Sequence, residues 1–461
     1  MTLLHHSLLA VLLIFGQCKA QKAETGSQPT AQNMTVQQDM RPPSKSVYQV
    51  RKFSPLQLAI DKAQPFDTIT IPPGRYLINT PIKIKTDDLT IICENCELVT
   101  PSKQNIMTAQ GIRNLTLIGL KASSAAPVSA NLLRMAGGTG LSMVNCRSEN
   151  IGLLFLEKGQ ENELHENLLI EGCEVNGAAG DGIKLQALSG FKIENSKFID
   201  CTRDGIKTNL APCEKGIIRK CYFESNGDDA FDLFGGGSDM LIDSSTFVES
   251  KLQLKNMGGK DYRKFIKNCT VRHNTFKDAT IICLSKYLPD SEFNGLHGIV
   301  VDSNTWINEE NVCFMTNGAV NYQFTNNNLF IKSGQTAINV RPPLGEGLIG
   351  HNTIKSGITY LETNPKKGVY LLHTKKQSDP HFGARDDQGI LRIENNTFIN
   401  GRRDLLLEGL SNYTLMNNVS IAQNDKSIYL GMKKNPKNQQ GRSFRRTVTN
   451  NKILREPPEK E

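Results

Sequence analysis

The chain has 461 residues, a formal net charge of +8 and eleven cysteines. This charge is modest for the length and gives only weak support to a surface that attracts a polyanion. Past the amino-terminal segment, no stretch approaches the ~20 apolar residues of a membrane helix, so we expect no membrane span.

The amino-terminal segment carries an apolar run over residues 8–15, followed by small and polar residues. The run is too short to cross a bilayer, and the pattern predicts a secretory signal peptide, residues 1–20, cleaved before Gln21. Acylation of Cys18 in a lipoprotein is an alternative, disfavoured by Gln17 where a small residue is expected. We therefore expect a secreted or periplasmic protein.

Residues 21–45 are rich in Gln, Thr, Ser and Pro, which predicts a flexible leader. The folded domain is expected over residues 46–455, with a tail over residues 456–461. Near its start, Ser54 and Pro55 precede the sequence L-Q-L-A-I-D-K-A, which predicts a short helix capped by Ser54. Such a helix would cover strand edges that are otherwise exposed at the amino end of a repeat protein.

Ten cysteines follow the signal peptide, and an even count in an exported protein permits disulfides. Cys93 and Cys96 form a C-x-x-C motif, but no second pair or histidine lies at the spacing of a zinc site. We therefore expect this pair to have a structural role.

A six-residue pattern, apolar-x-x-(Asn/Ser/Cys)-x-apolar, recurs along the chain, mostly 22 to 30 residues apart with one gap of 44. Its copies begin at Ile170, Ile193, Ile218, Ile242, Val271, Val301, Phe324, Ile349, Ile393, Leu415 and Val448. Each unit contains short β-branched and aromatic runs broken by Gly, Asn and Asp, without room for a crossover helix. The repeat predicts an all-β solenoid whose successive turns, here called coils, stack about 4.8 Å apart.

The fourth position of the pattern is expected to form a column along the solenoid. Its members are Cys173, Ser196, Cys221, Ser245, Asn274, Asn304, Asn327, Asn352, Asn396 and Asn418. Stacked Asn side chains can hydrogen-bond along such a column and satisfy backbone groups of the turn. Cysteines in the same column are expected to be buried small apolar fillers.

One column of the repeat carries charged residues in four successive coils. The sequence D-G-I-K ending at Lys184 is followed by D-G-I-K ending at Lys207, D-A-F-D ending at Asp232 and L-Q-L-K ending at Lys255. The steps of 23 to 25 residues are each about one coil. We therefore expect these four side chains to lie in register on one face of the solenoid.

Asp228, Asp229 and Asp232, with Asp204 one coil below, would place four carboxylates in a small volume. Such charges repel unless a cation neutralises them, and oxygen ligands favour Ca²⁺ or Mg²⁺ over zinc, while a flexible loop with several carboxylates favours Ca²⁺. A simple turn also explains the Asn-Gly-Asp-Asp sequence, but a turn does not require the other two carboxylates. The pattern therefore predicts a calcium site.

A lysine beside a bound divalent cation can have a lowered pKa and act as a base. Lys255 is the first candidate and Lys207 the second, with Lys184, Lys251 or Lys260 as further alternatives. A lysine that only points into solvent is the competing interpretation.

Residues 204–259 resemble polysaccharide lyase family 9, the Ca²⁺-dependent pectate lyases built on a right-handed parallel β-helix. In that family an Asp and, one coil later, an N-x-D-D-G-x-D sequence bind Ca²⁺, and a lysine in a G-F-K-L-G-G-like sequence abstracts the proton. The resemblance implies the four aspartates as ligands and Lys255 as the base. Two departures are Ala230 in place of Gly and the longer L-Q-L-K-N-M-G-G sequence. The sequence D-T-I-T-I-P-P-G-R-Y from Asp67 also resembles the first strand of such β-helices.

The implied activity is β-elimination on a uronate polymer, with homogalacturonan first and alginate or a glycosaminoglycan next. Ca²⁺ would neutralise the uronate carboxylate while a neutral lysine takes the C5 proton and the C4 oxygen leaves. We expect a monomer that binds an acidic polysaccharide and no nucleic acid.

Two alternatives remain open. A family 28 polygalacturonase is the first, but its N-T-D, D-D, G-H-G and R-I-K set is incomplete, with only a partial match at Leu296. A non-catalytic β-helix that binds carbohydrate is the second.

His273 and His351 are expected to face turns and have structural roles. The sequence does not place Arg272, Arg341 or Arg385 on the site, and His381 and Arg385 lie in the 44-residue gap, a possible substrate-shaping loop.

Overall fold

A computed structural model of the chain describes residues 47–49, 56–159, 164–209, 211–256, 265–285, 296–308, 312–331, 336–341, 345–357, 370–374, 389–399, 403–407, 412–422 and 446–455. All of these belong to one compact unit that begins at Pro42. The predicted signal peptide, the leader up to residue 45 and the tail after residue 455 lie outside the described residues.

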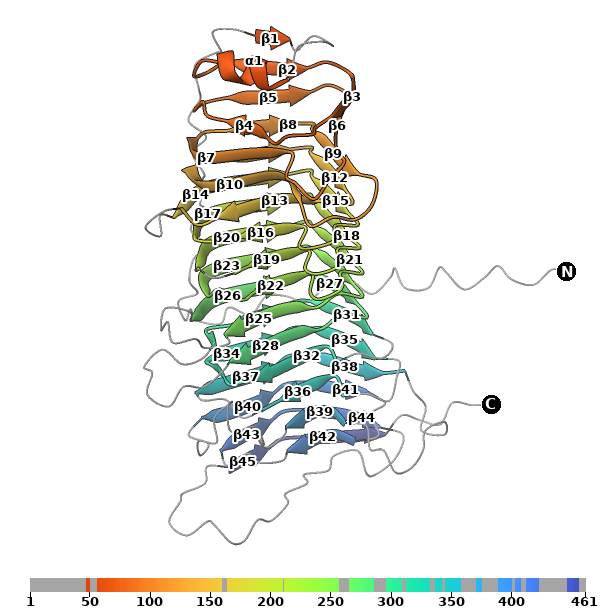
Figure 1. Ribbon diagram of the computed structural model, residues 1–461. Helices are drawn as coiled ribbons and strands as arrows, with labels where there is room; N and C mark the ends of the chain where they lie inside the picture. Colours follow the sequence, from red (N-terminus) through yellow and green to blue (C-terminus); the bar gives the residue numbers. More distant parts are fainter. Residues whose placement is uncertain are drawn as a thin grey trace, which may run out of the picture. The chain divides into compact units, whose positions relative to one another are not determined.

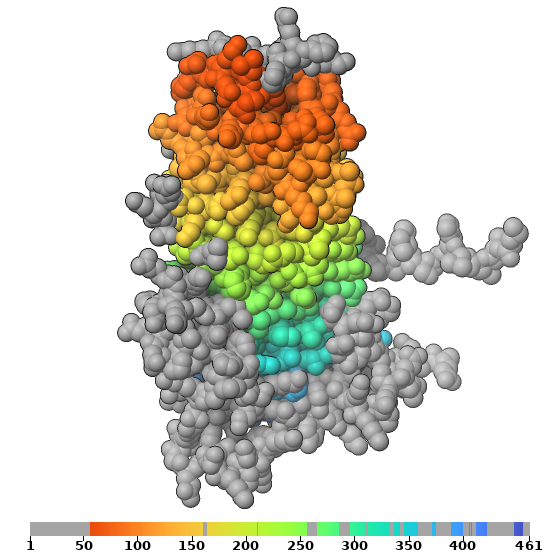
Figure 2. All heavy atoms as spheres, viewed as in Figure 1, coloured from red at the N-terminus to blue at the C-terminus, as the bar shows by residue number. Residues whose placement is uncertain are grey.

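The described chain is a parallel β-solenoid, as the repeat predicted. Most strands pair in parallel with strands of both the preceding and the following coil, so the coils follow one another from red to blue in Figure 1. The visible surface shows the same order as successive colour bands (Figure 2). The strands form three ladders, two of them joined in one sheet where β10 pairs with strands of both.

The first ladder, here called the site ladder, contains β4 (Ile82–Ile84), β7 (Met107–Arg113), β10 (Asn131–Thr139), β13 (Gly152–Glu157), β16 (Ile183–Leu185), β19 (Ile206–Thr208), β22 (Phe231–Leu233), β25 (Leu252–Asn256), β28 (Ile281–Ser285), β32 (Phe314–Asn317), β36 (Ile338–Val340), β39 (Tyr370–Thr374) and β42 (Arg403–Leu407).

The second ladder contains β1 (Val47–Gln49), β2 (Thr68–Ile71), β5 (Thr90–Cys93), β8 (Thr116–Ile118), β11 (Ser142–Val144), β14 (His165–Glu171), β17 (Leu188–Glu194), β20 (Cys213–Arg219), β23 (Gly237–Asp243), β26 (Ile266–Arg272), β29 (Leu296–His297), β30 (Val300–Asp302), β33 (Ala319–Val320), β34 (Tyr322–Thr325), β37 (Glu346–Gly350), β40 (Ile390–Glu394), β43 (Tyr413–Met416) and β45 (Arg446–Thr449).

The third ladder is a separate sheet of β3 (Gly74–Leu77), β6 (Cys96–Thr100), β9 (Lys121–Ser124), β12 (Arg147–Glu149), β15 (Glu174–Asn176), β18 (Lys197–Ile199), β21 (Tyr222–Glu224), β24 (Thr246–Val248), β27 (Thr275–Lys277), β31 (Thr305–Asn308), β35 (Asn328–Ile331), β38 (Thr353–Ser356), β41 (Thr397–Ile399), β44 (Val419–Ala422) and β46 (Lys452–Arg455).

The predicted capping helix is present as α1 (Leu56–Lys62), at the amino end of the solenoid beside β2 (Figure 1). Its Leu56 and Ile60 are buried in the core of the first coils. Gln57 accepts a hydrogen bond from the backbone N–H of Lys83 at 2.7 Å, which ties the helix to β4. The predicted cap at Ser54 lies outside the described residues. Among the residues that the structure describes, no helix has the length and apolar character to cross a bilayer.

The repeated six-residue pattern forms a turn between the second and third ladders. Its third residue takes a left-handed backbone, as at His273 (φ 54°) and His351 (φ 58°), which fits the structural roles expected for both histidines. At the fourth position, the Asn327 amide donates to Asn352 Oδ1 at 3.0 Å, and this link recurs in neighbouring coils. The complete Asn ladder runs through Asn274, Asn304, Asn327, Asn352, Asn396, Asn418 and Asn451.

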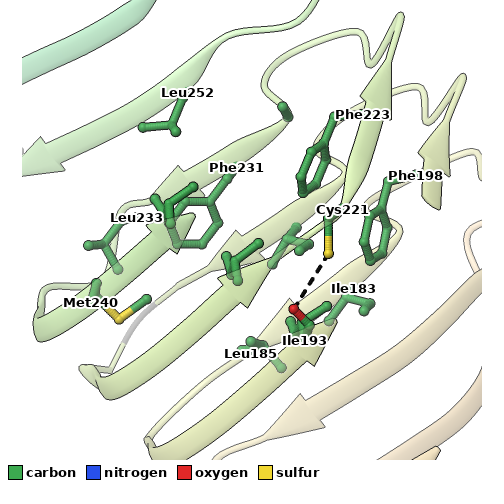
Figure 3. Close-up of a cluster of buried hydrophobic side chains, with 14 of the residues drawn as sticks. Ile183, Leu185, Ile193, Phe198, Cys221, Phe223, Phe231, Leu233, Met240 and Leu252 are labelled. Atoms are coloured by element: carbon green, nitrogen blue, oxygen red, sulfur yellow. Dashed lines mark hydrogen bonds between the residues drawn. The ribbon is translucent and has the colours of Figure 1, made fainter. Parts of the chain in front are cut away.

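The sixth position of the pattern points into the core and forms an aromatic stack. The rings of Phe198, Phe223, Phe247, Phe276 and Trp306 follow one another in successive coils, with centroids 4.6 to 5.2 Å apart. Figure 3 shows the first two of these rings side by side, with the apolar side chains of the site ladder across the core. The aromatic stack of the third ladder therefore packs across the core against mostly aliphatic side chains of the site ladder, with Phe231 among them.

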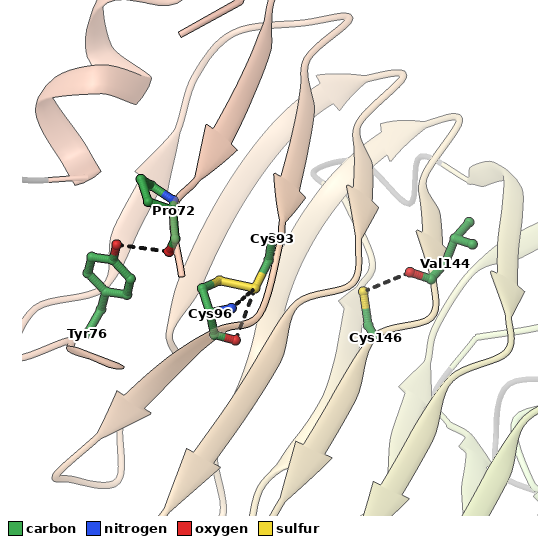
Figure 4. The surroundings of a disulfide bond; sticks show 6 residues. All are labelled: Pro72, Tyr76, Cys93, Cys96, Val144 and Cys146. Atoms are coloured by element: carbon green, nitrogen blue, oxygen red, sulfur yellow. Dashed lines mark hydrogen bonds between the residues drawn. A yellow bond between two sulfur atoms is a disulfide. The ribbon is translucent and has the colours of Figure 1, made fainter. Parts of the chain in front are cut away.

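The cysteines have structural roles throughout the described residues. Cys93 and Cys96 form a disulfide in the turn between the second and third ladders (Figure 4). The other eight described cysteines are free and buried. Cys173 and Cys221 occupy the fourth position of the pattern, as expected of small core residues.

Asp243 lies in a charged cluster on the outer surface of the second ladder, where it makes the fold sensitive to acid. Burial alone would raise the pKa of its carboxyl, but a hydrogen bond from His273 and the charges of Arg272 and Arg219 hold that pKa below 3.8. Asp243 therefore stabilises the fold above its ordinary pKa, and this contribution is lost as the pH falls through the lower folded-state value.

We expect Asp243→Asn to lower the free energy of unfolding by about 1 kcal/mol near pH 7. The difference from the wild type should shrink as the pH falls through the lowered pKa of Asp243, because the wild-type carboxyl then becomes protonated as well. Urea unfolding at pH 7 and across the acid range measures this. A difference that persists in acid would show that lost packing, not lost charge, is responsible.

Candidate functional site

Side chains that point outward from the site ladder form the column predicted to carry the chemistry, with one correction. Lys184, Lys207 and Asp232 pair in register in successive coils. The next residue in register is Gln253, not Lys255. The expected in-register position of Lys255 is therefore wrong by two residues.

The apolar side chains of β22 and β25 explain this register. Phe231 and Leu233 pair with Leu252 and Leu254, and all four are fully buried. The register expected from sequence spacing would set Asn256 against Leu233 and bury its polar amide in the core. Because a strand register follows the side chains that it buries, the coil here is shorter than the spacing of 23 residues suggested.

Three aspartates come together at the amino ends of β19 and β22. Asp204 and Asp229 lie in successive turns, which a hydrogen bond from Gly205 N to Asp229 O holds together at 2.8 Å, and Asp232 follows on β22. One oxygen of each carboxylate lies within 4.8 Å of the others, and all three residues are buried. We call these three residues the aspartate cluster.

Lys207 is tied into this cluster. Its Nζ donates to Asp204 Oδ2 at 2.6 Å and to Asp232 Oδ2 at 2.9 Å, and its side chain is only 10% exposed. Burial by itself would lower the pKa of the ammonium group, but the two carboxylate partners raise that pKa above its usual value. Lys207 therefore stays protonated and holds the two carboxylates in place.

The pKa values of the three carboxyl groups are raised as well, which disfavours their charged form, whereas the raised pKa of Lys207 favours its charged form. Burial raises the pKa of Asp204 to about 6, although the bond to Lys207 opposes the rise. Burial and the charges of Asp232 and Asp204 raise the pKa of Asp229 to about 7. Burial also raises the pKa of Asp232. A single ammonium group therefore leaves this cluster under-neutralised.

The donor set of the cluster fits a hard divalent cation. Among the described residues, Oδ1 of Asp204 and Oδ1 of Asp232 are buried and accept no hydrogen bond. With all groups ionised, three carboxylates and one ammonium leave two formal negative charges. Buried oxygens without partners are costly unless a cation or water satisfies them, and carboxylate oxygens suit Ca²⁺ or Mg²⁺. Asp204, Asp229 and Asp232 are therefore the residues that could hold such an ion.

Asp228, the fourth expected ligand, lies apart from the cluster. Its side chain is 59% exposed, and its Oδ2 is 3.6 Å from Arg203 Nε. The same Arg203 nitrogen is 3.8 Å from Asp181 Oδ1. In this structure Arg203 joins two turns outside the cluster, and Asp228 faces this arginine.

Lys255 lies beside the cluster, two residues after Gln253 on β25, at the next position whose side chain points outward from the site ladder. It is half-buried, and its Nζ is 5.6 Å from the centre of the Phe234 ring. Lys207 Nζ is 5.8 Å from the same ring, so Phe234 lies near both ammonium groups. The positive charge of Lys255 also acts to lower the pKa of the Asp232 carboxyl, against the effect of burial.

The other lysine candidates are less closely placed. Lys251 is exposed, but its charge acts on Asp229. Lys184 lies one coil from Lys207, with its Nζ 5.1 Å from the Phe155 ring. Lys260 and the glycines after Lys255 lie outside the described residues.

Sequence reasoning missed three neighbours of the cluster. Asp181 is the first residue of the earliest D-G-I-K sequence, and its charge acts on both Asp204 and Asp232, so the repeat itself could have identified it. Gln253 and Phe234 had no such signal, because their places depend on the register of β25.

Of the unassigned arginines, Arg272 lies 3.5 Å from Asp243 on the second ladder, and Arg385 lies outside the described residues.

The fold and these side chains define a parallel β-solenoid with an acidic, lysine-flanked site on one outer face. Residues 131–378 match the family described as Right handed beta helix region, and the chain belongs to this family. No curated protein matches the sequence.

Several solved structures are similar to this chain. An Azotobacter vinelandii mannuronan C-5 epimerase A-module has 13% identity over 87% of this chain and 94% of its own, with a TM-score of 0.49. The catalytic domain of a GH87 α-1,3-glucanase in complex with nigerose has 13% identity, with coverage of 89% and 70% and a TM-score of 0.44. An alginate lyase from Paenibacillus sp. str. FPU-7 has 12% identity, with coverage of 66% and 94% and a TM-score of 0.35. The activities named are those of the other proteins.

Proposed function

We propose that the protein is a secreted, calcium-dependent polysaccharide lyase of the family 9 type, which cleaves a uronate polymer, pectate first, by β-elimination. The observation that carries the proposal is the aspartate cluster, with two buried oxygens that lack partners, beside a half-buried lysine. The resemblance of residues 204–259 to family 9 supports the same reaction.

Each residue of the site has a role in this proposal. Asp204, Asp229 and Asp232 would hold the calcium ion, which when bound would neutralise the substrate carboxylate and so make the neighbouring C–H bond more acidic. Lys207 holds Asp204 and Asp232 through its two ion pairs. We do not assign it as the base, because a protonated lysine between two carboxylates cannot accept a proton.

Lys255 in its amine form is the proposed base. It would take the C5 proton, the electron pair left behind would form the C4=C5 double bond, and the C4–O bond would break. The leaving oxygen takes a proton, so the products are one unsaturated sugar end and one ordinary end. No water is consumed in this step, which separates it from hydrolysis.

Lys255→Gln is expected to lower kcat by at least about 100-fold, the usual contribution of a positioned general base. The matched control is Lys277→Gln, an exposed lysine on the third ladder, which should leave kcat unchanged. Rates follow from the ultraviolet absorbance of the unsaturated product. Full activity in Lys255→Gln would remove this residue from the mechanism and leave Lys251 and Lys184 to be tested in the same way.

The reaction type is tested with purified protein on pectate, alginate and a glycosaminoglycan, with added calcium and with chelator. We expect an ultraviolet-absorbing product that disappears with chelator and returns with calcium. New reducing ends without absorbance would point to a hydrolase. Binding without any cleavage would point to a carbohydrate-binding protein, and either outcome would overturn the lyase proposal.

A further inference from the structure

A row of cations and one aromatic ring leads away from the aspartate cluster toward the amino end. Arg134 on β10, Phe155 on β13 and Lys184 on β16 pair in register, and the same row continues into Lys207 and Asp232. All five side chains therefore point outward from the site ladder. Four coil steps of about 4.8 Å put Arg134 roughly 19 Å from Asp232 along the solenoid axis.

The ring holds the two cations in this row. Arg134 Cζ lies 5.5 Å and Lys184 Nζ lies 5.1 Å from the centre of the Phe155 ring, and the two cations belong to the coils before and after it. Arg134 Nη2 also contacts Glu157 Oε2 at 2.5 Å. Cation–π contacts of this kind restrict a long side chain while its charged end stays accessible. The Arg134 side chain is 45% exposed, so it can still meet a ligand.

The row is not symmetric about the cluster. On the carboxyl side, the next four residues in register are uncharged: Gln253, Ile282, Met315 and Asn339. From Arg134 to Asn339, the cationic residues at this outward position therefore lie on the amino side of Asp232. Lys207 does not add to the accessible positive charge, because its ammonium group is buried between two carboxylates, whereas the Arg134 side chain is 45% exposed beside its one partner, Glu157.

We propose that Arg134, Phe155 and Lys184 form a binding track for an acidic polysaccharide that lies along the solenoid axis. The proposal rests on the proposed function and extends it, because it places the anionic sugars on the amino side of the aspartate cluster. Each cation would meet an acidic group of the polymer, and the span of the row requires an oligosaccharide of several sugars. A neutral polymer gains nothing from these charges.

The test measures binding of a galacturonic acid hexamer to Lys255→Gln protein, which removes the proposed base so that the ligand persists. Adding Lys184→Gln or Arg134→Gln is expected to raise Kd about two- to fivefold each, and both together about tenfold. The effect should shrink at high salt, where exposed charges are screened. Lys277→Gln and Lys355→Gln, on the third ladder, are the matched controls and should leave Kd unchanged. Lys184→Arg keeps the charge and should bind nearly as the parent does.

The same changes in the chain that retains Lys255 should raise KM and leave kcat within about twofold, because they act on binding and not on the reacting atoms. Cleavage of pectate with no effect of either substitution would overturn the track and leave the proposed function intact. Track-dependent binding without cleavage of any uronate polymer would keep the track and overturn the lyase proposal. No preference for the acidic hexamer over a neutral one would overturn the track whatever the activity.

Discussion

Replacing Lys207 by methionine is expected to make the folded state depend on calcium. The change removes the ammonium group between Asp204 and Asp232, so three close carboxylates lose their internal cation. Loss of one partner from a buried ion pair costs about 3 to 5 kcal/mol of unfolding free energy. Calcium that binds the cluster would restore part of this loss, about 2.7 kcal/mol at a concentration of about 100 times its Kd.

Urea unfolding of Lys207→Met in chelator and in excess calcium measures both effects. The matched control is Lys184→Met, one coil away at the same outward position, which has no carboxylate partner among the contacts of the described residues and should gain no more stability from calcium than the wild type does. A parallel series with magnesium tests the choice of ion. If calcium fails to restore any stability to Lys207→Met, the aspartate cluster is not a cation site.

Asn327→Ala is expected to have a comparable cost for a different reason. The Asn327 side chain accepts hydrogen bonds from the backbone N–H and the amide of Asn304 at 2.9 and 3.1 Å, and donates to Val301 O and to Asn352 Oδ1. Alanine would leave the buried Asn304 N–H without this acceptor and open a small cavity. We expect a loss of about 2 to 4 kcal/mol in the free energy of unfolding.

The control for this substitution is Asn328→Ala, the next residue along the chain, whose side chain is exposed on β35. It should change the free energy of unfolding by less than about 0.5 kcal/mol. Urea titration of both variants decides the comparison. Equal losses would mean that the ladder position gives Asn327 no special role.

Activity and stability are expected to respond differently to substitutions in these two parts of the molecule. Asn327 lies on the turn between the second and third ladders, whereas the aspartate cluster lies at the amino ends of β19 and β22 on the site ladder. Asn327→Ala should therefore lower the midpoint of unfolding without changing the metal dependence of activity under conditions where it is folded. Lys207→Met should change both.

The fold was predictable because successive coils of a solenoid repeat the same sequence pattern. The apolar-x-x-(Asn/Ser/Cys)-x-apolar pattern recurs so regularly that one correct reading of Asn274 applies to Asn304, Asn327 and beyond, and the hydrogen bonds of the ladder follow. The capping helix was predictable as well, because the residues that indicated it, Ser54, Pro55 and the sequence L-Q-L-A-I-D-K-A, are adjacent in the chain. Neither required knowledge of how distant segments pack.

The site was predictable only in part. The spacing of the D-G-I-K and D-A-F-D sequences brought Asp204 and Asp232 into adjacent coils, because these coils have nearly equal length. The coil that follows Asp232 is shorter along the ladder, so counting residues misplaced Lys255. Asp228 was grouped with its neighbours from sequence proximity, but adjacent residues in a turn point in different directions, and this one faces Arg203.

By itself, the sequence determined the coil, its Asn ladder and the approach of acidic residues from separate turns, because each depends on a periodic pattern. Only the tertiary structure decided that Lys207 lies between two carboxylates, that Gln253 takes the place expected for Lys255, and that Arg134 and Lys184 flank one ring. The physical reason is that strand register is set by which apolar side chains bury against one another across coils. Which apolar side chains bury together depends on the packing of neighbouring coils, and the spacing of residues along the chain does not reveal it.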